Sequence, residues 1–319
     1  MKKLSLAFAV LLCTLPLASL AQSWPQRPVK FILSLGPGSG ADLGARLYAD
    51  RLTRMWGQPV VVENRPGGDG VIAINAVIQA KDDHTLLWGP TANFVGHPYS
   101  LDQMPYDPKE LQPVARVSGT VVTLSVPAAM NVASLKDLVA AAKQKPGSLN
   151  WTTAVTMTDI ILEGFFKTQG IDAAHIRYKQ PAEAVNDLIN DRIQLYSSAY
   201  AIVRAQVQGG KVKLLAVQAR NRVPGLDLPT VAEVGFPGLD FEGLVGIIAA
   251  RSSNLPAAAR DRIGADIKTV SKDPLVAERL ASTAQLNIPG DAAEFAQSIE
   301  EQVQQLAASA KLLGMKPKQ

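Results

Sequence analysis

Cysteine is almost absent from this chain of 319 residues, because Cys13 is the only one. It lies in an N-terminal segment with the parts of a secretory signal, namely two lysines, an apolar stretch and a small-x-small triplet that ends at Ala21. Leu12 stands where a lipoprotein signal needs a small residue, and the apolar stretch is too short for the alternative, a retained membrane anchor. We therefore expect cleavage of residues 1–21 after Ala21. The exported mature chain would then have no disulfide, no thiolate nucleophile and no cysteine metal site.

Histidine and unbalanced charge are also scarce. The three histidines, His84, His97 and His175, fall in separate segments, and none has a metal-ligating partner at helical spacing. The net charge of +4 includes the two lysines of the signal segment, and the other charges of both signs are interspersed. No basic stripe with interleaved aromatic residues occurs in the sequence. The composition thus predicts no metal site and no binding to nucleic acid.

Nucleotide-binding motifs are present only in a weak form. Residues 68–73 satisfy the pattern G-x-G-x-x-A, but Gly68 comes six positions after Val62, too late for the tight first turn of a dinucleotide fold. The loop Gly36–Asp42 is not a phosphate-binding P-loop, because Asp42 stands where the lysine would be. We expect no cofactor.

Two apolar runs that end in glycine-rich loops are the most informative positive feature. Phe31–Leu35 leads into the loop Gly36–Asp42, and Val60–Val62 leads into a loop with glycines at positions 67, 68 and 70. Each run is typical of a buried strand, and a helix is expected after each loop. A strand that ends in glycine lets a ligand approach the main chain, and the following helix offers free amides. The two loops are therefore predicted to form one wall of a site for a small polar ligand.

Short apolar runs alternate with amphipathic segments along the chain, which favours an α/β fold with mainly parallel sheets. Ile176–Tyr178 is expected to be one of the strands. Two longer apolar strands, Val121–Val126 and Leu244–Ala250, are expected to cross between two lobes. The first lobe would comprise residues 22–120 and 245–319, and the second residues 121–244. Two doubly wound domains joined by two crossover strands, with a ligand cleft between them, would form a hinged binding protein.

Polar residues gather at the expected carboxyl ends of strands in both lobes, where α/β domains bind ligands. The first-lobe candidates are Leu35, Gly38, Ser39, Gly40, Ala41, Asp42, Pro90, Thr91 and Asn93. The second-lobe candidates are Thr152, Thr153, Thr156, Thr158, Ser197, Ser198 and Tyr200. Because residues 31–45 contain no Arg or Lys, amides and hydroxyls are the expected donors to a carboxylate. Each hydroxyl could instead cap the helix that follows it, and Asp42 is expected to cap its helix rather than contact an anion.

Several short motifs resemble, in order, those of one protein family. They are Trp24–Lys30, Gly36–Asp42, Pro105–Pro108, Lys145–Gly147, Tyr178-Lys179, Gly209–Val212 and Leu228–Glu233. Over nearly all of its length after residue 22, the chain resembles the Bug/TctC family, the periplasmic substrate-binding proteins of tripartite tricarboxylate transporters. The resemblance implies a two-lobed periplasmic binding protein of type II that is a monomer and binds a small carboxylate. The implied partners are the membrane subunits of the transporter or a sensor kinase.

The second lobe departs from the pattern of that family. Where members carry a glycine-rich stretch with a histidine, this chain reads Thr152–Asp159. Where members carry a Met-Phe-Asp run, it reads Tyr196-Ser197-Ser198. We expect a bulkier second-lobe surface with more hydroxyls, so the resemblance does not identify the ligand.

An exported serine hydrolase that acts on a small ester or amide is the alternative function. Ser39, an aspartate and His97 could form a triad, but Gly38 and Gly40 directly flank the serine. That is not the glycine spacing of a nucleophile elbow. The sequence therefore favours capture of a solute without catalysis.

Overall fold

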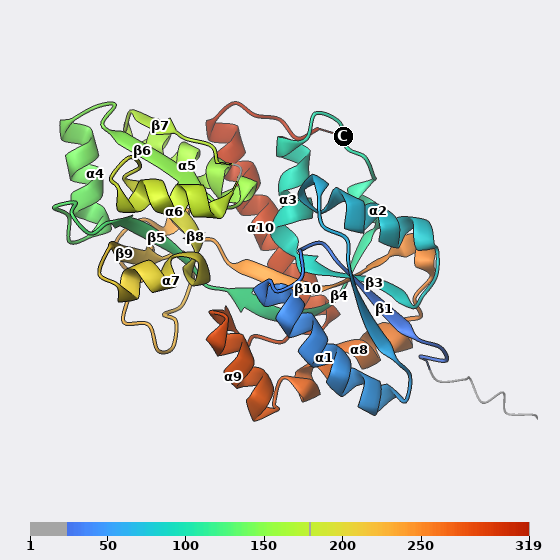
Figure 1. Ribbon diagram of the computed structural model, residues 1–319. Coiled ribbons are helices and arrows are strands. Elements are labelled where there is room, and N and C mark those ends of the chain that lie inside the picture. Colours follow the sequence, from blue (N-terminus) through green and yellow to red (C-terminus); the bar gives the residue numbers. More distant parts are fainter. Residues whose placement is uncertain (1–23, 179, 319) are drawn as a thin grey trace, which may run out of the picture.

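The structure, a computed structural model, describes residues 24–178 and 180–318 (Figure 1). The expected signal peptide and its cleavage after Ala21 lie outside the described residues. Two β-sheets with helices packed around them form two lobes, which Figure 1 shows side by side. Among the described helices, none combines the length and the apolar character needed to cross a membrane.

The first sheet has six strands in the order β11-β4-β10-β3-β1-β2. Their bounds are β1 Val29–Leu33, β2 Val60–Asn64, β3 Thr85–Pro90, β4 Leu111–Thr120, β10 Gly243–Ala250 and β11 Gln285–Leu286. Strands β1, β2 and β3 are parallel, whereas β10 runs antiparallel to both β3 and β4. Apolar side chains of β1, β3 and β10 are almost fully buried, which explains why these segments read as continuous hydrophobic runs.

The second sheet has five strands in the order β7-β6-β8-β5-β9. Their bounds are β5 Val122–Pro127, β6 Leu149–Thr153, β7 Ala173–His175, β8 Leu195–Ala199 and β9 Val212–Val217. The prediction of a strand at Ile176–Tyr178 is wrong, because β7 lies three residues earlier. There His175 stacks on Trp151 of β6 with ring centroids 4.1 Å apart, and this cross-strand contact sets the register.

Both sheets are mixed rather than mainly parallel. Strand β5 runs antiparallel to β8 and β9, just as β10 does to β3 and β4. The reason is topological. The strand that enters each sheet from the other lobe, β5 in the second sheet and β10 in the first, runs against its neighbours, whereas β4 runs in the same direction as β3.

Ten α-helices and four 3-10 helices lie in the described part of the chain. The α-helices are α1 Gly40–Trp56, α2 Val71–Ala80, α3 Thr91–Ser100, α4 Leu135–Gln144, α5 Thr156–Gln169, α6 Pro181–Ile189, α7 Tyr200–Gln208, α8 Ala257–Val270, α9 Pro274–Ser282 and α10 Ala292–Leu312. The 3-10 helices are η1 Gly68–Gly70, η2 Pro108–Glu110, η3 Pro237–Leu239 and η4 Arg251–Ser253. Ser134 caps the start of α4, and Gly170 ends α5 in a left-handed conformation.

Helix α10 joins the two lobes as well as completing the first. It packs against α5 of the second lobe, and Figure 1 shows it between the two sheets. A Cβ on Gly164 of α5 would lie 3.3 Å from the carbonyl oxygen of Ser309 on α10, so the two backbones approach closely. Phe295 and Leu306 of α10 belong to a buried cluster that contains Ile32 of the first sheet and Trp151 of the second. The lobes therefore share an apolar core on the α5 side.

Candidate ligand-binding site

Helix α1 begins in the first glycine-rich loop, and its start is held by reciprocal hydrogen bonds. The Ser39 hydroxyl oxygen caps the helix by accepting a bond of 3.2 Å from the Asp42 amide. The Asp42 carboxylate in turn accepts bonds from the Gly38 amide at 2.9 Å, from Asn64 Nδ2 at 2.9 Å and from Arg46 Nε at 3.2 Å. Burial alone would raise the pKa of the Asp42 carboxyl, but these hydrogen bonds hold it below its ordinary value.

Ser39, rather than the expected Asp42, is therefore the N-cap. Asp42 is 2% exposed and turns back into the loop, so its negative charge is neutralised before it can face a ligand. The helix starts at Gly40, and among the described residues the amides of Gly40 and Ala41 have no acceptor. These two amides and the hydroxyl hydrogen of Ser39 remain free for an anion at the positive end of α1.

Ser34 lies beneath this loop, between the ends of β1 and β3. Its side chain is 6% exposed, and its hydroxyl has no hydrogen-bond partner in the described part of the chain. A Cβ on Gly89 would lie only 2.6 Å from this hydroxyl, so the glycine is needed for the close approach. The neighbouring Leu35 fastens the loop to β2, because its carbonyl accepts a bond of 3.0 Å from Asn64 Nδ2.

The candidates after β3 are largely occupied by bonds within the protein. Pro90 precedes the first residue of α3, and Thr91 is fully buried and donates a bond of 2.6 Å to Gln302 of α10. Asn93 donates a bond of 2.7 Å to Asp69 in the second glycine-rich loop. Asn93 thus connects the first turn of α3 to the second glycine-rich loop, whereas Thr91 has no free hydroxyl hydrogen.

Two of the four second-lobe threonines order their own loop. Thr153 donates to the carboxylate of Asp159, which also contacts His175 Nε2 at 3.2 Å, and Thr158 donates to the Val155 carbonyl at 2.6 Å. Among the described residues, the hydroxyls of the other two, Thr152 and Thr156, have no partner. Neither threonine caps α5, whose start has no side-chain cap, but both hydroxyls are used within the loop.

The candidates after β8 divide in a similar way. The Ser197 hydroxyl donates to Gln218, whose own amide donates a bond of 2.9 Å to the Leu239 carbonyl of η3, shortly before the second crossover. Ser198 is 1% exposed, and its hydroxyl makes only a long contact of 3.4 Å with the next carbonyl. Tyr200 begins α7, and its amide donates a bond of 2.8 Å to Val121 at the first crossover.

The lobes face each other at two places near these loops. A Cβ on Gly96 of α3 would lie 3.9 Å from Met157, so the first turn of α5 lies against α3. A cavity of about 710 Å³ opens between α7 and α9, and its lining includes Tyr200, Arg204 and Gln285. The sequence predicted only Tyr200 among these three. Gln285 was missed because it lies in a two-residue edge strand without a glycine-rich loop.

A hydrolytic triad is not formed by the histidine considered for it. His97 is fully buried, with Nδ1 2.6 Å from the Tyr106 hydroxyl and Nε2 2.9 Å from the Asp69 carbonyl. Burial lowers the pKa of His97, although the neighbouring Asp69 opposes this effect. Both ring nitrogens are thus engaged away from Ser39, so His97 does not serve as a base for that hydroxyl.

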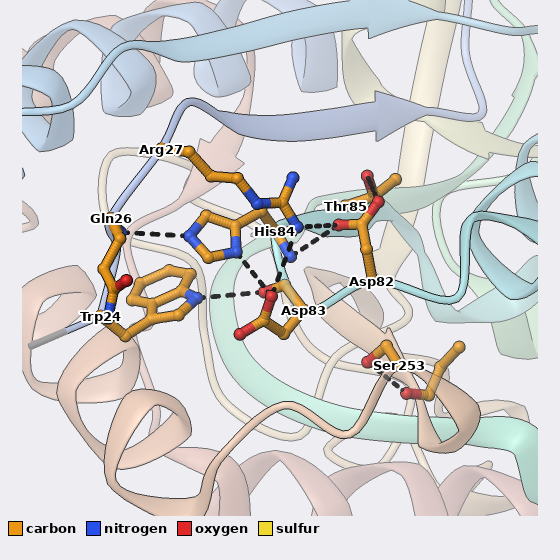
Figure 2. A network of polar contacts seen from close by, with 9 residues as sticks. Trp24, Gln26, Arg27, Asp82, Asp83, His84, Thr85 and Ser253 are labelled. Atoms are coloured by element: carbon orange, nitrogen blue, oxygen red, sulfur yellow. Dashed lines mark hydrogen bonds and ion pairs between the residues drawn. The ribbon is translucent and has the colours of Figure 1, made fainter. Parts of the chain in front are cut away.

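One cluster of potential metal ligands, Asp82, Asp83 and His84, occurs among the described residues. Figure 2 shows that this cluster instead contacts residues 24–27, which precede β1. The Gln26 amide donates to His84 Nε2 at 3.2 Å, so Nδ1 carries the proton that is shared with Asp83 at 2.6 Å. Asp82 accepts from Arg27 and Thr85. The imidazole lone pair that a metal would need is already used.

Comparisons with known proteins agree with this geometry. The family described as "Tripartite tricarboxylate transporter family receptor" (TctC) matches residues 44–315. A UPF0065 protein of Bordetella bronchiseptica is 30% identical over 304 residues, which cover 94% of this chain and 90% of that protein. Protein BugT of Bordetella pertussis is 30% identical over 223 residues, 68% of either chain.

Solved structures show the same two-lobed fold. The R. palustris protein Rpa4515, solved with adipate, superposes with a TM-score of 0.78 at 26% identity and covers 92% of this chain and 100% of its own. The periplasmic binding protein BugD superposes with a TM-score of 0.72 at 25% identity and covers 93% and 100% of the two chains. These relatives are binding proteins rather than enzymes. The chain is therefore a solute-binding protein that belongs to the TctC family of tripartite tricarboxylate transporter receptors.

Proposed function

We propose that this protein is exported to the periplasm, captures a small organic carboxylate between its lobes and delivers it to the membrane subunits of a tripartite tricarboxylate transporter. The observation that carries the proposal is the start of α1. The free donors are the amides of Gly40 and Ala41 and the hydroxyl of Ser39. They lie at the positive, N-terminal end of α1, a helix of 17 residues. Hydrogen bonds to a charged acceptor of this kind contribute about 1.5–3 kcal/mol each when buried.

The lack of an available cation in the first glycine-rich loop supports the proposal that neutral donors hold the carboxylate. The loop contains no Arg or Lys, and the nearest cation along α1, Arg46, is already paired with Asp42 at 3.0 Å. The structure of Rpa4515 with adipate adds support, because that protein is similar to this chain over its full length. The hydrolase alternative is disfavoured, since both nitrogens of His97 are engaged by Tyr106 and Asp69.

The proposed mechanism is closure of two lobes around the solute. We propose lobes at residues 22–120 plus 245–319 and at residues 121–244, because the strands of the described chain pass from one sheet to the other between β4 and β5 and return between β9 and β10. A ligand that contacts the α1 start on one lobe and the β6–α5 or β8–α7 loop on the other would favour the closed form. Such a mechanism needs no chemical step.

A thermal-shift and calorimetry screen with acetate, succinate, adipate and citrate tests the function. We expect saturable binding of at least one of these acids and no turnover of matched esters. Small-angle scattering should show a smaller radius of gyration at saturating ligand. Failure of all four acids to bind would overturn carboxylate capture, and ester hydrolysis would favour the rival function.

Export, assembly and delivery are tested separately. Mass spectrometry of the periplasmic protein should find Gln22 as the first residue, and light scattering should find a monomer. Cells that lack this protein should lose uptake of the bound acid in the same way as cells that lack the transporter membrane subunits. If uptake persists but transcription in response to the acid is lost, the partner is a sensor kinase instead.

A further inference from the structure

Gln285 lies against the first turn of α1, although it comes from a distant strand. A Cβ on Gly40 would lie 2.6 Å from Gln285 Nε2, so the side-chain amide reaches the helix start directly. Gly40 has no positive φ, and its lack of a side chain is therefore explained by this close approach. The feature that looked like a ligand-binding glycine in the sequence also makes room for a glutamine.

The orientation of the Gln285 side-chain amide is fixed by a hydrogen bond at its oxygen, Oε1. Oε1 accepts a hydrogen bond of 2.8 Å from the buried hydroxyl of Ser118 on β4. The amide therefore presents Nε2, a donor, toward the start of α1. Gln285 is 7% exposed, and among the described residues Nε2 has no acceptor. Nε2 itself keeps some access to solvent, so it can donate to an acceptor in the adjoining space.

The space beside Gln285 can hold such an acceptor. Gln285 lines the cavity of about 710 Å³ between α7 and α9, which also contacts Tyr200 of the second lobe. Gly40, at the start of α1, lies beside Nε2 but is not part of the cavity lining. Gln285 therefore connects the start of α1 to a cavity that both lobes line.

We propose that Gln285 is a ligand-binding and specificity-determining residue, whose Nε2 donates a hydrogen bond to a carboxylate oxygen of the solute beside the amides of α1. This inference rests on the proposed function and identifies a contact that the sequence did not predict. Because Ser118 holds Oε1, the site offers only a donor at this point. It accepts a carboxylate or carbonyl oxygen and disfavours an ammonium group.

Gln285→Glu and Gln285→Met test the contact by calorimetry. The probes are the tightest binder among acetate, succinate, adipate and citrate, and the monoamide of that acid. Gln285→Glu should weaken carboxylate binding by more than about tenfold, because a donor is replaced by a negative charge. The monoamide should lose less affinity, because the new carboxylate accepts from its NH2 group. Gln285→Met should weaken both probes.

The ratio of the two dissociation constants separates direct contact from a structural effect. A variant that is merely destabilised weakens both probes equally, and thermal unfolding without ligand reports that loss. Gln144→Glu on the exposed end of α4 makes the same change in charge far from the cavity and should behave as wild type. An unchanged ratio in Gln285→Glu, or binding by Gln285→Met within twofold of wild type, would overturn this inference alone. Absence of wild-type binding to all four acids would overturn it together with the proposed function.

Discussion

Arg204 on α7 donates a hydrogen bond of 3.0 Å through Nη1 to the carbonyl oxygen of Ser282 at the end of α9. A side chain of the second lobe is thus fastened to the backbone of the first. The carbonyl belongs to the last turn of α9, which lacks intrahelical donors and carries the negative end of the helix dipole. Arg204 lines the α7–α9 cavity, so this bond connects the two lobes at the edge of that cavity.

The first prediction is that Arg204→Met shifts the lobes toward an open form. A partly exposed hydrogen bond of this kind contributes about 1 kcal/mol, which corresponds to a roughly fivefold change in the balance of forms and in affinity. Small-angle scattering without ligand should show a larger radius of gyration than in wild type. Arg192→Met is the control, because Arg192 pairs with Asp187 inside the second lobe. Equal scattering curves for Arg204→Met and wild type would show that the bond does not hold the lobes together.

The second prediction concerns acid stability at the start of α10. Asp291 caps this helix in a reciprocal box with Glu294, and Lys268 lies 2.8 Å away. The hydrogen bond from Lys268, followed by those from the helix amides, lowers the pKa of Asp291 from 3.8 to about 2. Because the folded pKa lies below the unfolded value, the stabilisation is complete above about pH 4 and is lost as the pH falls toward 2.

Asp291→Asn keeps a capping oxygen but removes this charge. Urea unfolding should therefore show a stability gap from wild type at pH 6 that closes between pH 4 and pH 2. Asp291→Ala should lose about 1 kcal/mol more, because the cap itself is gone. Asp261→Asn on the exposed side of α8 is the matched control. A gap that stays constant down to pH 2 would contradict the assignment.

The third prediction is that Gly246→Ala strongly destabilises the protein. A Cβ at this position in β10 would overlap the ring of Phe295 and lie 2.7 Å from the Ala115 carbonyl oxygen. The carbonyl belongs to the paired strand β4 and cannot move aside, so we expect a loss of about 1–3 kcal/mol. Gly238→Ala, which has open space around it, should be nearly neutral. Urea unfolding at neutral pH compares the two.

The lobes and the crossovers were predictable because they depend on long apolar runs and on glycines that end helices. Strand β10 is buried along its whole length, and α1 ends at Gly57 with a left-handed φ of 66°. Strand β7 was misplaced because its residues, Ala173–His175, have weak strand propensity. The stacking of His175 on Trp151 places them in the sheet, and no local pattern encodes such a contact.

The candidate site was only partly visible in the sequence for the same reason. The glycine-rich loop at the start of α1 has a local signature, and it supplied Ser39 and the free amides. Thr91 also matched the pattern of a residue at a strand end, but its hydroxyl is taken by Gln302, which is 211 positions away in the chain. Gln285 reaches the α1 start across a similar distance. The spacing of residues in the sequence does not predict which side chains reach a site from distant segments of the chain.

The fourth prediction follows from the contact between Gly40 and Gln285. Gly40→Ala would place a Cβ 2.6 Å from Nε2, and the end of a flexible side chain can swing away from it. The fold should therefore survive with little change in melting temperature, whereas binding of the preferred carboxylate should fall by more than about tenfold through the lost donor. Differential scanning fluorimetry and calorimetry measure the two effects. Unchanged affinity in a stable Gly40→Ala protein would argue against a role for either residue in binding.

The last prediction distinguishes neutral donors from a guanidinium as the main carboxylate contact. Ser39 caps α1 through its oxygen and keeps its hydroxyl hydrogen for a ligand, so Ser39→Ala removes both interactions. Loss of the cap should cost about 1 kcal/mol of stability. Loss of a buried donor to a carboxylate should weaken binding by about tenfold to a hundredfold.

Arg65→Ala is the control for that experiment. Arg65 directly follows β2, and its Nε donates a bond of 2.6 Å to Glu63 of that edge strand, while its side chain is 43% exposed. Removing it should leave affinity within about twofold of wild type, because an exposed pair of this kind contributes little. Calorimetry at two salt concentrations compares the variants, since a guanidinium contact would weaken with salt more steeply than amide contacts. If Arg65→Ala abolishes binding while Ser39→Ala leaves it intact, a guanidinium clamp holds the solute and the start of α1 does not.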